Sequence, residues 1–341
     1  MTISSRTSEK GGALLTVLWV SAALAAIAFS VSMSIRAETD RAGTAADGLR
    51  AMYLATGSVD RGVQWLLWGT GAGNFFDRHY YSEKPRLNFS YPTGDVVVEM
   101  TPEAAKLDIN RASGDDLLRL VTVVTGDSTR AREITNGILG WRGGAPAAPD
   151  LLSQTLGPTF QSRSASFEEI EELLLVRGMT PELYYGNYVA EGNGRLSPRG
   201  GLRDSLSVWG SQGPFDANAV SPALLQALGA SPGAIAQLVQ RRAQQPFRNL
   251  GEVAALGIPI DHLEVNGEHL IWNIRATARL RRPDGSPSEV VRSASAVATL
   301  VLPPKNRRRD PIRLKVLRFY EDAWSEFAAA PPAPAAGALL P

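Results

Sequence analysis

Residues 11–35 read GGALLTVLWVSAALAAIAFSVSMSI and contain no charged side chain. At about 1.5 Å of rise per residue, a helix of this length exceeds the roughly 30 Å hydrocarbon core of a bilayer. Arg6 and Lys10 precede the run, and positive charge ahead of a span favours an N-terminus that stays inside the cell. The run therefore predicts one transmembrane helix over residues 12–35, followed by a large domain outside the cytoplasm.

Two other interpretations of this apolar run remain open. A cleaved secretory signal would use the small residues Ala22-Ala23 or Ala25-Ala26 as its processing site. The apolar region of such a signal is roughly 7–15 residues long, so the longer run favours a membrane span. The other alternative is an apolar helix buried inside a soluble protein.

An apolar stripe continues beyond the predicted span with alternating steps of three and four residues, the period of one helix face. Its members are Ala42, Ala45, Leu49, Met52, Thr56, Val59, Val63 and Leu66. No proline interrupts residues 1–84, and the GTGAG at 69–73 is a plausible helix end. We therefore expect one helix from about Gly12 to Trp68, with its second half packing this stripe on the protein's own domain.

The composition of the 341-residue chain excludes several kinds of chemistry. It has a formal net charge of +1, so its overall charge does not point to nucleic acid as a partner. It has no cysteine, which rules out disulfides, thiolate nucleophiles and cysteine-ligated metals. The three histidines, His79, His262 and His269, do not have the spacing of paired ligands. No phosphate loop or nucleophile elbow occurs, so we expect a protein without enzymatic activity; an enzyme would need a cofactor or acid–base pair that emerges only on folding.

Two segments in the middle of the chain repeat each other. Residues 107–113 read LDINRAS and residues 215–221 read FDANAVS, with Asp, Asn and Ser recurring at an offset of 108. Each is followed by leucines at helical spacing and by a second similar piece, at 167–179 and 247–258. Asn or Ser before an apolar period is typical of a helix N-cap, and glycine of a helix end. The pattern predicts short helical hairpins of the helix-hairpin-helix (SAM-like) kind.

Helical hairpins of this kind can hold a DNA phosphate at a helix N-terminus. That function favours a Gly-x-Gly-like turn, which the segment after Leu120 lacks and which residues 229–233 match only in part. The flanking residues are acidic. Packing or partner contact is therefore favoured, and a membrane-anchored DNA-binding or uptake protein remains the alternative.

The C-terminal part has the alternation of β-strands. Residues 270–280 and 290–302 flank a turn at 283–287, and residues 312–320 supply a further strand. With the strand at 95–100, they predict an antiparallel sheet on which the long helix packs, hence an α+β fold. The Ala/Pro-rich residues 329–341 are expected to form a disordered tail.

The Lys10-Gly11 junction, the small apolar residues after it and the two-part helix resemble type IV pilin-like proteins. This resemblance implies a leader, residues 1–11, that a prepilin peptidase removes after Gly11 or Gly12 before methylating the new N-terminus. Thr16, or Val17 for the other cut, then takes the fifth mature position, where most of the family carry Glu. In the family that Glu pairs with the N-terminal amine of a neighbouring subunit, and one minor class, the K-type pseudopilin of type II secretion, is known for lacking it.

Residues 167–186, FEEIEELLLVRGMTPELYYG, and the DANA at 216–219 are similar to this K-type class, the GspK family of minor pseudopilins. The resemblance implies a helical domain inserted into a pilin-like α/β domain. We place the insertion at 105–212, with a return crossing over the Gly/Ser/Pro-rich residues 192–213. The pilin-like parts are then 36–104 and 213–328.

The same resemblance implies a single-pass protein of the inner membrane whose bulk is periplasmic. Its partners would be other minor pseudopilins, the prepilin peptidase and inner-membrane lipid, with no nucleic acid. The missing Glu and the bulky insertion suit the tip of the pseudopilus, the fibre that serves protein export across the outer membrane.

Bound structural calcium is a further possibility that the family resemblance implies. Acidic side chains that offer oxygen ligands are Asp108, Asp115, Asp116, Asp127 and those within 168–172. Their spacing is not that of an EF-hand, so no ligand set is assigned. A solvated acidic helix face explains the same residues.

Overall fold

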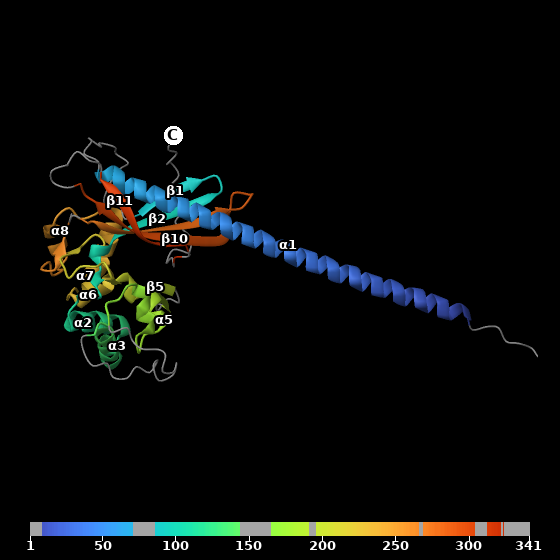
Figure 1. The fold of residues 1–341 in the computed structure, drawn as a ribbon, viewed down its shortest axis with the longest axis horizontal. Helices are drawn as coiled ribbons and strands as arrows, with labels where there is room; N and C mark the ends of the chain where they lie inside the picture. The colour runs from blue at the N-terminus through green and yellow to red at the C-terminus, as the bar shows by residue number, and fades with distance from the viewer. Residues whose placement is uncertain are drawn as a thin grey trace, which may run out of the picture.

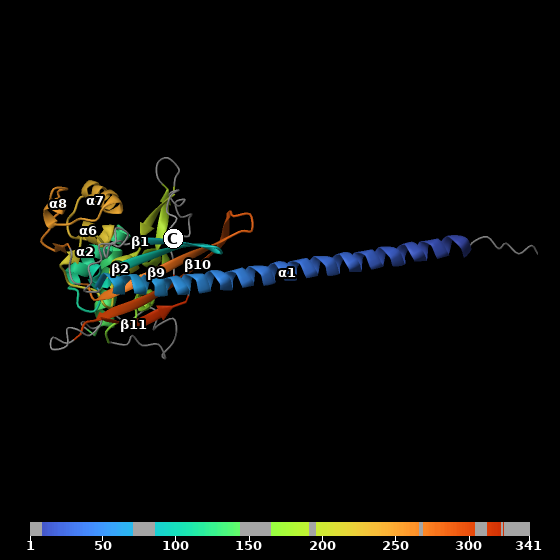
Figure 2. The ribbon, with the colours of Figure 1, turned by 90° about the horizontal axis from the view of Figure 1, so that it is seen from above.

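The computed structural model describes residues 9–70, 86–143, 165–190, 196–265, 269–303, 312–321 and 323. Helix α1 (Glu9–Thr70) is a single uninterrupted helix of 62 residues. Its N-terminal half extends alone beyond the rest of the protein, and residues 12–46 are exposed (Figures 1 and 2). The expectation of one continuous helix is confirmed. The helix continues to Thr70, within the GTGAG at 69–73 that was expected to end it, and residues 71–73 lie outside the described residues.

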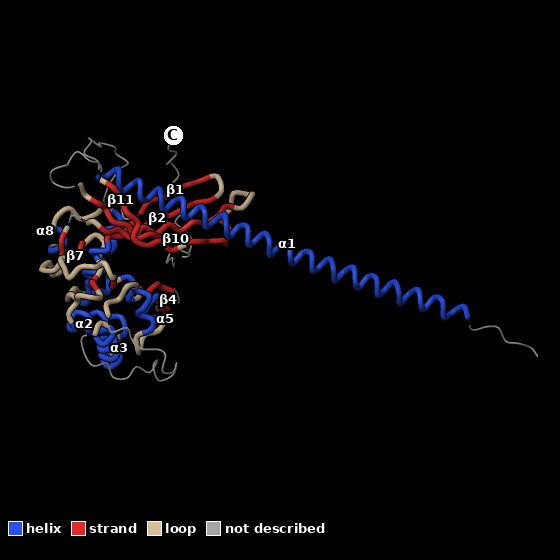
Figure 3. The backbone as a smooth tube through the Cα atoms, in the orientation of Figure 1, coloured by secondary structure: helices blue, strands red, loops and turns tan. Residues whose placement is uncertain are grey.

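A five-stranded sheet lies beside the C-terminal half of α1 (Figure 3). Its order is β1 (Arg86–Tyr91), β2 (Gly94–Pro102), β9 (Ile271–Arg281), β10 (Pro287–Val301) and β11 (Arg313–Tyr320). All neighbouring strands are antiparallel. The α+β class and the three predicted C-terminal strands are therefore confirmed, whereas strand β1 was not predicted.

On the face of the sheet that carries α1, strands β9 and β10 present mostly alanine, whereas β2 presents Val96, Val98 and Met100. Ala276 and Ala278 on β9 and Ala294, Ala296 and Ala298 on β10 are fully buried beneath the helix. Alternate residues along each strand point to the other face. That second face is more polar and includes Glu99, Arg275 and Ser295, although Val97 and Val297 are also buried on it.

The chain leaves the sheet between two neighbouring strands, because β2 ends at Pro102 and its partner β9 begins at Ile271. The intervening elements lie on the side of the sheet opposite α1 (Figure 1). The first half comprises η1 (Glu103–Ala105), β3 (Leu107–Asp108), α2 (Gly114–Thr125), α3 (Ser128–Trp141), η2 (Ile170–Leu175), α5 (Pro181–Tyr185), β4 (Gly186–Ala190) and β5 (Leu196–Gly200). The second half comprises η3 (Leu202–Asp204), β6 (Leu206–Ser207), β7 (Phe215–Asp216), α6 (Pro222–Ala227), α7 (Pro232–Gln244), α8 (Leu250–Ala254) and β8 (Leu263–Glu264).

These elements share one hydrophobic core that runs from Leu107 to Leu263 and is separate from the core beneath α1. The second hairpin contributes Phe215, Leu238 and Val253 to it. Its apolar side chains therefore pack with the first hairpin and not in the core beneath α1. We propose residues 103–270 as the inserted domain, longer than the 105–212 that the Gly/Ser/Pro-rich stretch had suggested.

Candidate assembly surface

The N-terminal half of α1 is long and apolar enough to cross a membrane, and it is not covered by the rest of the described chain. Gly11 and Gly12 lie within the first turns of this helix. The hydroxyl of Thr16 donates to the carbonyls of Gly12, at 3.2 Å, and Ala13, at 2.9 Å. Thr16 thus has its polar group satisfied by its own helix and presents no charge to a neighbour. Most of the predicted leader, residues 1–8, lies outside the described residues.

The face that α1 buries on the sheet differs from the predicted stripe. The buried residues of α1 are Gly48, Ala51, Ala55, Ser58, Val59, Gly62 and Leu66. Only Val59 and Leu66 belong to both sets, and the predicted Ala42, Ala45 and Leu49 are exposed. The prediction was wrong there because small residues let the helix backbone approach the alanine-lined sheet. At Gly62 a Cβ atom would lie 2.8 Å from Ile274 Cγ2 and 2.9 Å from Val98 Cγ1.

The predicted stripe lies on a flank of α1, about a quarter turn from the buried face at 100° per residue. The opposite flank is the one facing β1, because the Arg61 guanidinium lies 4.3 Å from the ring centroid of Phe89. The stripe therefore faces the other edge of the sheet, where β11 lies. Leu49 on this flank is 55% exposed.

Strand β11 presents apolar side chains on the same face of the sheet as α1. Val316 pairs with Ala298 and Phe319 with Ala296, and both alanines lie beneath α1. Val316 is 49% exposed and Phe319 is 42% exposed. We call the surface formed by Leu49, Met52, Thr56, Val63, Val316 and Phe319 the α1–β11 surface. Exposed aliphatic and aromatic side chains gathered in this way are typical of an interaction site.

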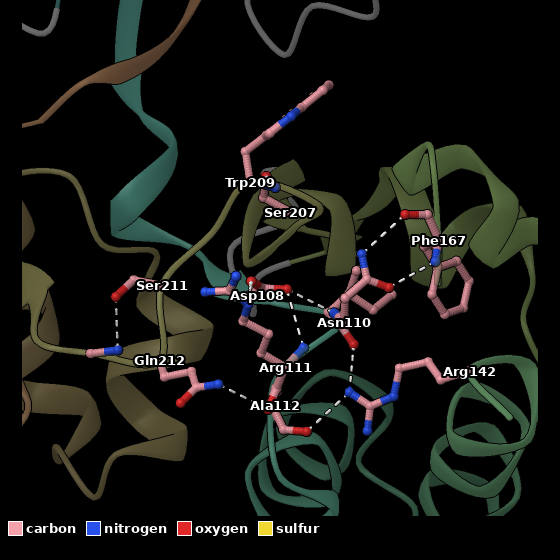
Figure 4. Close-up of polar contacts among 12 residues, drawn as sticks. Asp108, Asn110, Arg111, Ala112, Arg142, Phe167, Ser207, Trp209, Ser211 and Gln212 are labelled. Atoms are coloured by element: carbon pink, nitrogen blue, oxygen red, sulfur yellow. Dashed lines mark hydrogen bonds and ion pairs between the residues drawn. The ribbon is translucent and has the colours of Figure 1, made fainter. Parts of the chain in front are cut away.

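The two predicted hairpin repeats form matching hydrogen bonds. In the first, Asn110 Nδ2 donates to the Phe167 carbonyl at 3.0 Å and the Phe167 amide donates to Asn110 Oδ1 at 2.7 Å (Figure 4). In the second, Asn218 Nδ2 donates to the Phe247 carbonyl at 3.1 Å and the Phe247 amide donates to Asn218 Oδ1 at 2.7 Å. Each asparagine thus ties the start of its repeat to its second piece.

In each repeat an arginine donates a hydrogen bond to a backbone carbonyl near the start of the repeat. The sequence analysis identified neither arginine. Arg142 Nη1 donates to the carbonyl of Ala112 at 3.0 Å (Figure 4), and Arg242 Nη1 donates to that of Val220 at 2.7 Å. The two arginines are offset by 100 residues instead of 108, so an alignment at constant offset does not pair them. Burial lowers the pKa of the Arg242 guanidinium to about 10, against the opposing effect of the Asp216 charge.

The hairpin turns are capped from within. The Asp127 carboxylate accepts hydrogen bonds from the amides of Thr129 at 2.8 Å and Arg130 at 3.3 Å, at the N-terminus of α3. Ser231 Oγ accepts from the amide of Ala234 at the N-terminus of α7. A phosphate approaching α3 would meet a negative charge where it needs free amides. This geometry disfavours the DNA-binding alternative for the first hairpin.

The acidic residues considered for calcium do not converge. Within the described ranges, no group of three or more His, Asp or Glu side chains is placed to hold a metal ion. Asp108 Oδ1 instead accepts from the amides of Asn110 and Arg111, and Glu169 pairs with Arg318 at 3.2 Å. These residues therefore do not fit a calcium site in the observed arrangement.

Comparison with solved structures gives a likeness to set beside this geometry. No protein-family model matches the sequence, and no curated protein matches it. A chain of the GspK–GspI–GspJ complex from the type 2 secretion system of enterotoxigenic Escherichia coli matches with a TM-score of 0.50. The match covers 81% of this chain and 97% of that chain, at 13% sequence identity. The chain has a pseudopilin fold.

The likeness to this pseudopilin fold includes the inserted domain, because α1 and the sheet alone cannot supply 81% of the chain. The insertion lies toward the end of the molecule far from the apolar half of α1 (Figures 1 and 2). The apolar half of α1 and the insertion are thus at opposite ends of the molecule.

Proposed function

We propose that the protein is a minor pseudopilin of a type II secretion system, a structural component of the pseudopilus and not an enzyme. The structural likeness supports this function, together with the exposed apolar half of α1. In this proposal α1 anchors the chain in the inner membrane and the remainder is periplasmic. The prepilin peptidase removes the leader after Gly11 or Gly12 and methylates the new N-terminus.

The α1–β11 surface is the proposed contact with other minor pseudopilins. It continues from the apolar half of α1, so a neighbouring helix could follow α1 from the lipid into the periplasm. Leu49 and Phe319 would become buried in such a contact. In the isolated chain these two side chains are 55% and 42% exposed. Fully burying an exposed side chain of this size contributes about 1.5–3 kcal/mol, so each of these half-exposed side chains would contribute roughly half of that.

The proposal also places this subunit at the tip of the pseudopilus. Thr16 offers no carboxylate to the N-terminal amine of a further subunit, and an unpaired ammonium group within lipid is costly. The inserted domain adds bulk at the membrane-distal end, where a further subunit would stack. Both features suit a subunit that has neighbours beside and below it but none above.

The assembly contact can be tested by replacing Leu49 with lysine. Leu49→Lys is expected to fold normally, because the residue is 55% exposed, but to lose copurification with the other minor pseudopilins from membranes. The matched control is Gln64→Lys, which adds the same charge to an exposed position of α1 on the side turned away from the sheet. Equal copurification by both variants would remove this surface from the proposal.

The tip position is tested by where the protein lies in the fibre. Antibody raised against the inserted domain is expected to label pseudopili at one end only. Labelling along the length of the fibre would show that other subunits stack above this one, and the tip assignment would fail.

A further inference from the structure

The polar face of the sheet does not pack tightly against the inserted domain. Two adjoining cavities, of about 1310 Å³ and 670 Å³, lie between them. Both are lined by Lys106, Tyr185, Asn273 and Arg275, so the two cavities meet at these residues. We call the combined space the interdomain cleft.

The interdomain cleft crosses the sheet from one edge to the other. Its larger part is lined by Arg86 on β1 and Glu99 on β2, and its smaller part by Ser295 on β10 and Tyr320 on β11. At about 4.8 Å between neighbouring strands, five strands span about 19 Å, the length of roughly six extended residues. The shape therefore suits a short extended peptide segment better than a compact small molecule.

Arg275 lies where the two parts of the cleft meet. Its Nε atom is buried and has no hydrogen-bond partner within the described part of the chain. Glu99 lies opposite Arg275 on the neighbouring strand. Its carboxylate forms an ion pair with Arg86, with Oε1 3.0 Å from Arg86 Nη2. A buried donor atom without an acceptor is energetically unfavourable, and a carboxylate is the acceptor that pairs best with a guanidinium.

Other cations along the cleft already have partners. Lys106 Nζ lies 3.1 Å from Glu103 Oε1, and Arg199 Nη2 donates to the Val123 carbonyl at 3.0 Å. Arg275 Nε is therefore a donor at the centre of the cleft that an incoming carboxylate can satisfy, beside the charge of Glu99 that already acts on Arg275. On the opposite wall, Ile235 and the 36% exposed Val239 of α7 provide apolar contacts.

We propose that the interdomain cleft binds an extended segment of another polypeptide, with an acidic side chain on Arg275 and apolar side chains against Ile235 and Val239. This binding site is additional to the assembly contact along α1. Its argument stands whether or not the chain functions in secretion, because it uses only the cleft and its charges.

The test uses the full-length chain in detergent and a display library of random hexapeptides as the probe. Selected peptides are expected to carry Asp or Glu at one position with apolar neighbours. The best peptide should bind at least about tenfold more tightly than its counterpart with Gln in place of Glu, the range for a charge-assisted hydrogen bond. Selection without acidic enrichment would overturn the proposal.

The matched variants are Arg275→Gln and Arg279→Gln. Arg279 lies on the same strand and the same face but lines neither part of the cleft. Arg275→Gln should lose the preference for the acidic peptide, while Arg279→Gln should keep it, with both folds checked by circular dichroism. An unchanged preference for the acidic peptide in Arg275→Gln would overturn the proposal. Free acetate that binds as tightly as the peptide would also overturn it, because the cleft would then recognise a carboxylate and not a polypeptide.

Discussion

Replacing Gly62 with alanine is expected to disturb the contact between α1 and the sheet. The added Cβ would lie 2.8 Å from Ile274 Cγ2 and 2.9 Å from Val98 Cγ1, on neighbouring strands of the sheet. Carbon atoms in favourable contact are about 3.5–4.0 Å apart, so either the helix or both side chains must move. Overpacking of this kind typically costs about 1–3 kcal/mol.

The higher helix propensity of alanine stabilises the Gly62→Ala variant and so opposes the destabilising clash. A control variant that shows the propensity effect alone allows the two effects to be separated. Alanine is favoured over glycine in a helix by up to about 1 kcal/mol. Gly57 is an exposed glycine of the same helix, and a Cβ atom added to it would have no neighbour within 4 Å, so Gly57→Ala should show the propensity gain alone. The difference between the two variants isolates the clash, and we expect Gly62→Ala to be less stable than Gly57→Ala by about 1–3 kcal/mol.

The assay is urea unfolding of the full-length chain in detergent, followed by tryptophan fluorescence. Trp65 of α1 and Trp272 of β9 pack against the core beneath the helix, so they contribute to the change in emission of the seven tryptophans on unfolding. If Gly62→Ala proved as stable as Gly57→Ala, the helix would not approach the sheet as closely as described, and the small-residue explanation of the buried face would be wrong.

Two further predictions concern other parts of the domain. Asn110→Ala and Asn218→Ala each remove two hydrogen bonds to backbone groups, so each should lower the free energy of unfolding by about 1–3 kcal/mol in urea titrations; unchanged midpoints would contradict the role of the repeats. Burial raises the pKa of the Glu99 carboxyl above 4.5, although Arg86 and Arg275 oppose the shift, so the folded chain binds this proton more tightly than the unfolded chain. The stability that protonated Glu99 contributes is lost as the pH rises through its raised pKa, and Glu99→Gln should lose less stability than the native chain between pH 4.5 and neutral pH. An identical pH dependence of the unfolding midpoint would contradict this.

Several features of the fold could be predicted from the sequence because each has a strong local signal. The uncharged run at 11–35 predicted a transmembrane helix, and the structure has a helix there that is long and apolar enough to span a membrane. Alternation predicted strands β9 and β10. The repeated Asp, Asn and Ser predicted the hairpins, because Ser113 and Ser221 do cap helices α2 and α6.

The features that the sequence did not predict depend on tertiary packing, which leaves little hydrophobic pattern in the sequence. The buried face of α1 is made largely of Gly, Ala and Ser, so larger apolar residues such as Leu49 drew the prediction to the adjacent flank. The proposed extent of the insertion, 103–270, rests on the pairing of β2 with β9, which the sequence does not reveal. Arg275 looks like any strand arginine in the sequence, because its cleft is formed by residues distant along the chain.

The central claim is that this chain is exported and processed as a pilin-like subunit. It is tested most directly by mass spectrometry of the mature N-terminus, from membranes with and without the prepilin peptidase. We predict a cut after Gly11 or Gly12 with a methylated N-terminus, present only when the peptidase is present. An intact leader, or a cut near Ala26, would contradict the account and leave an anchored or secreted protein that only shares the pseudopilin fold.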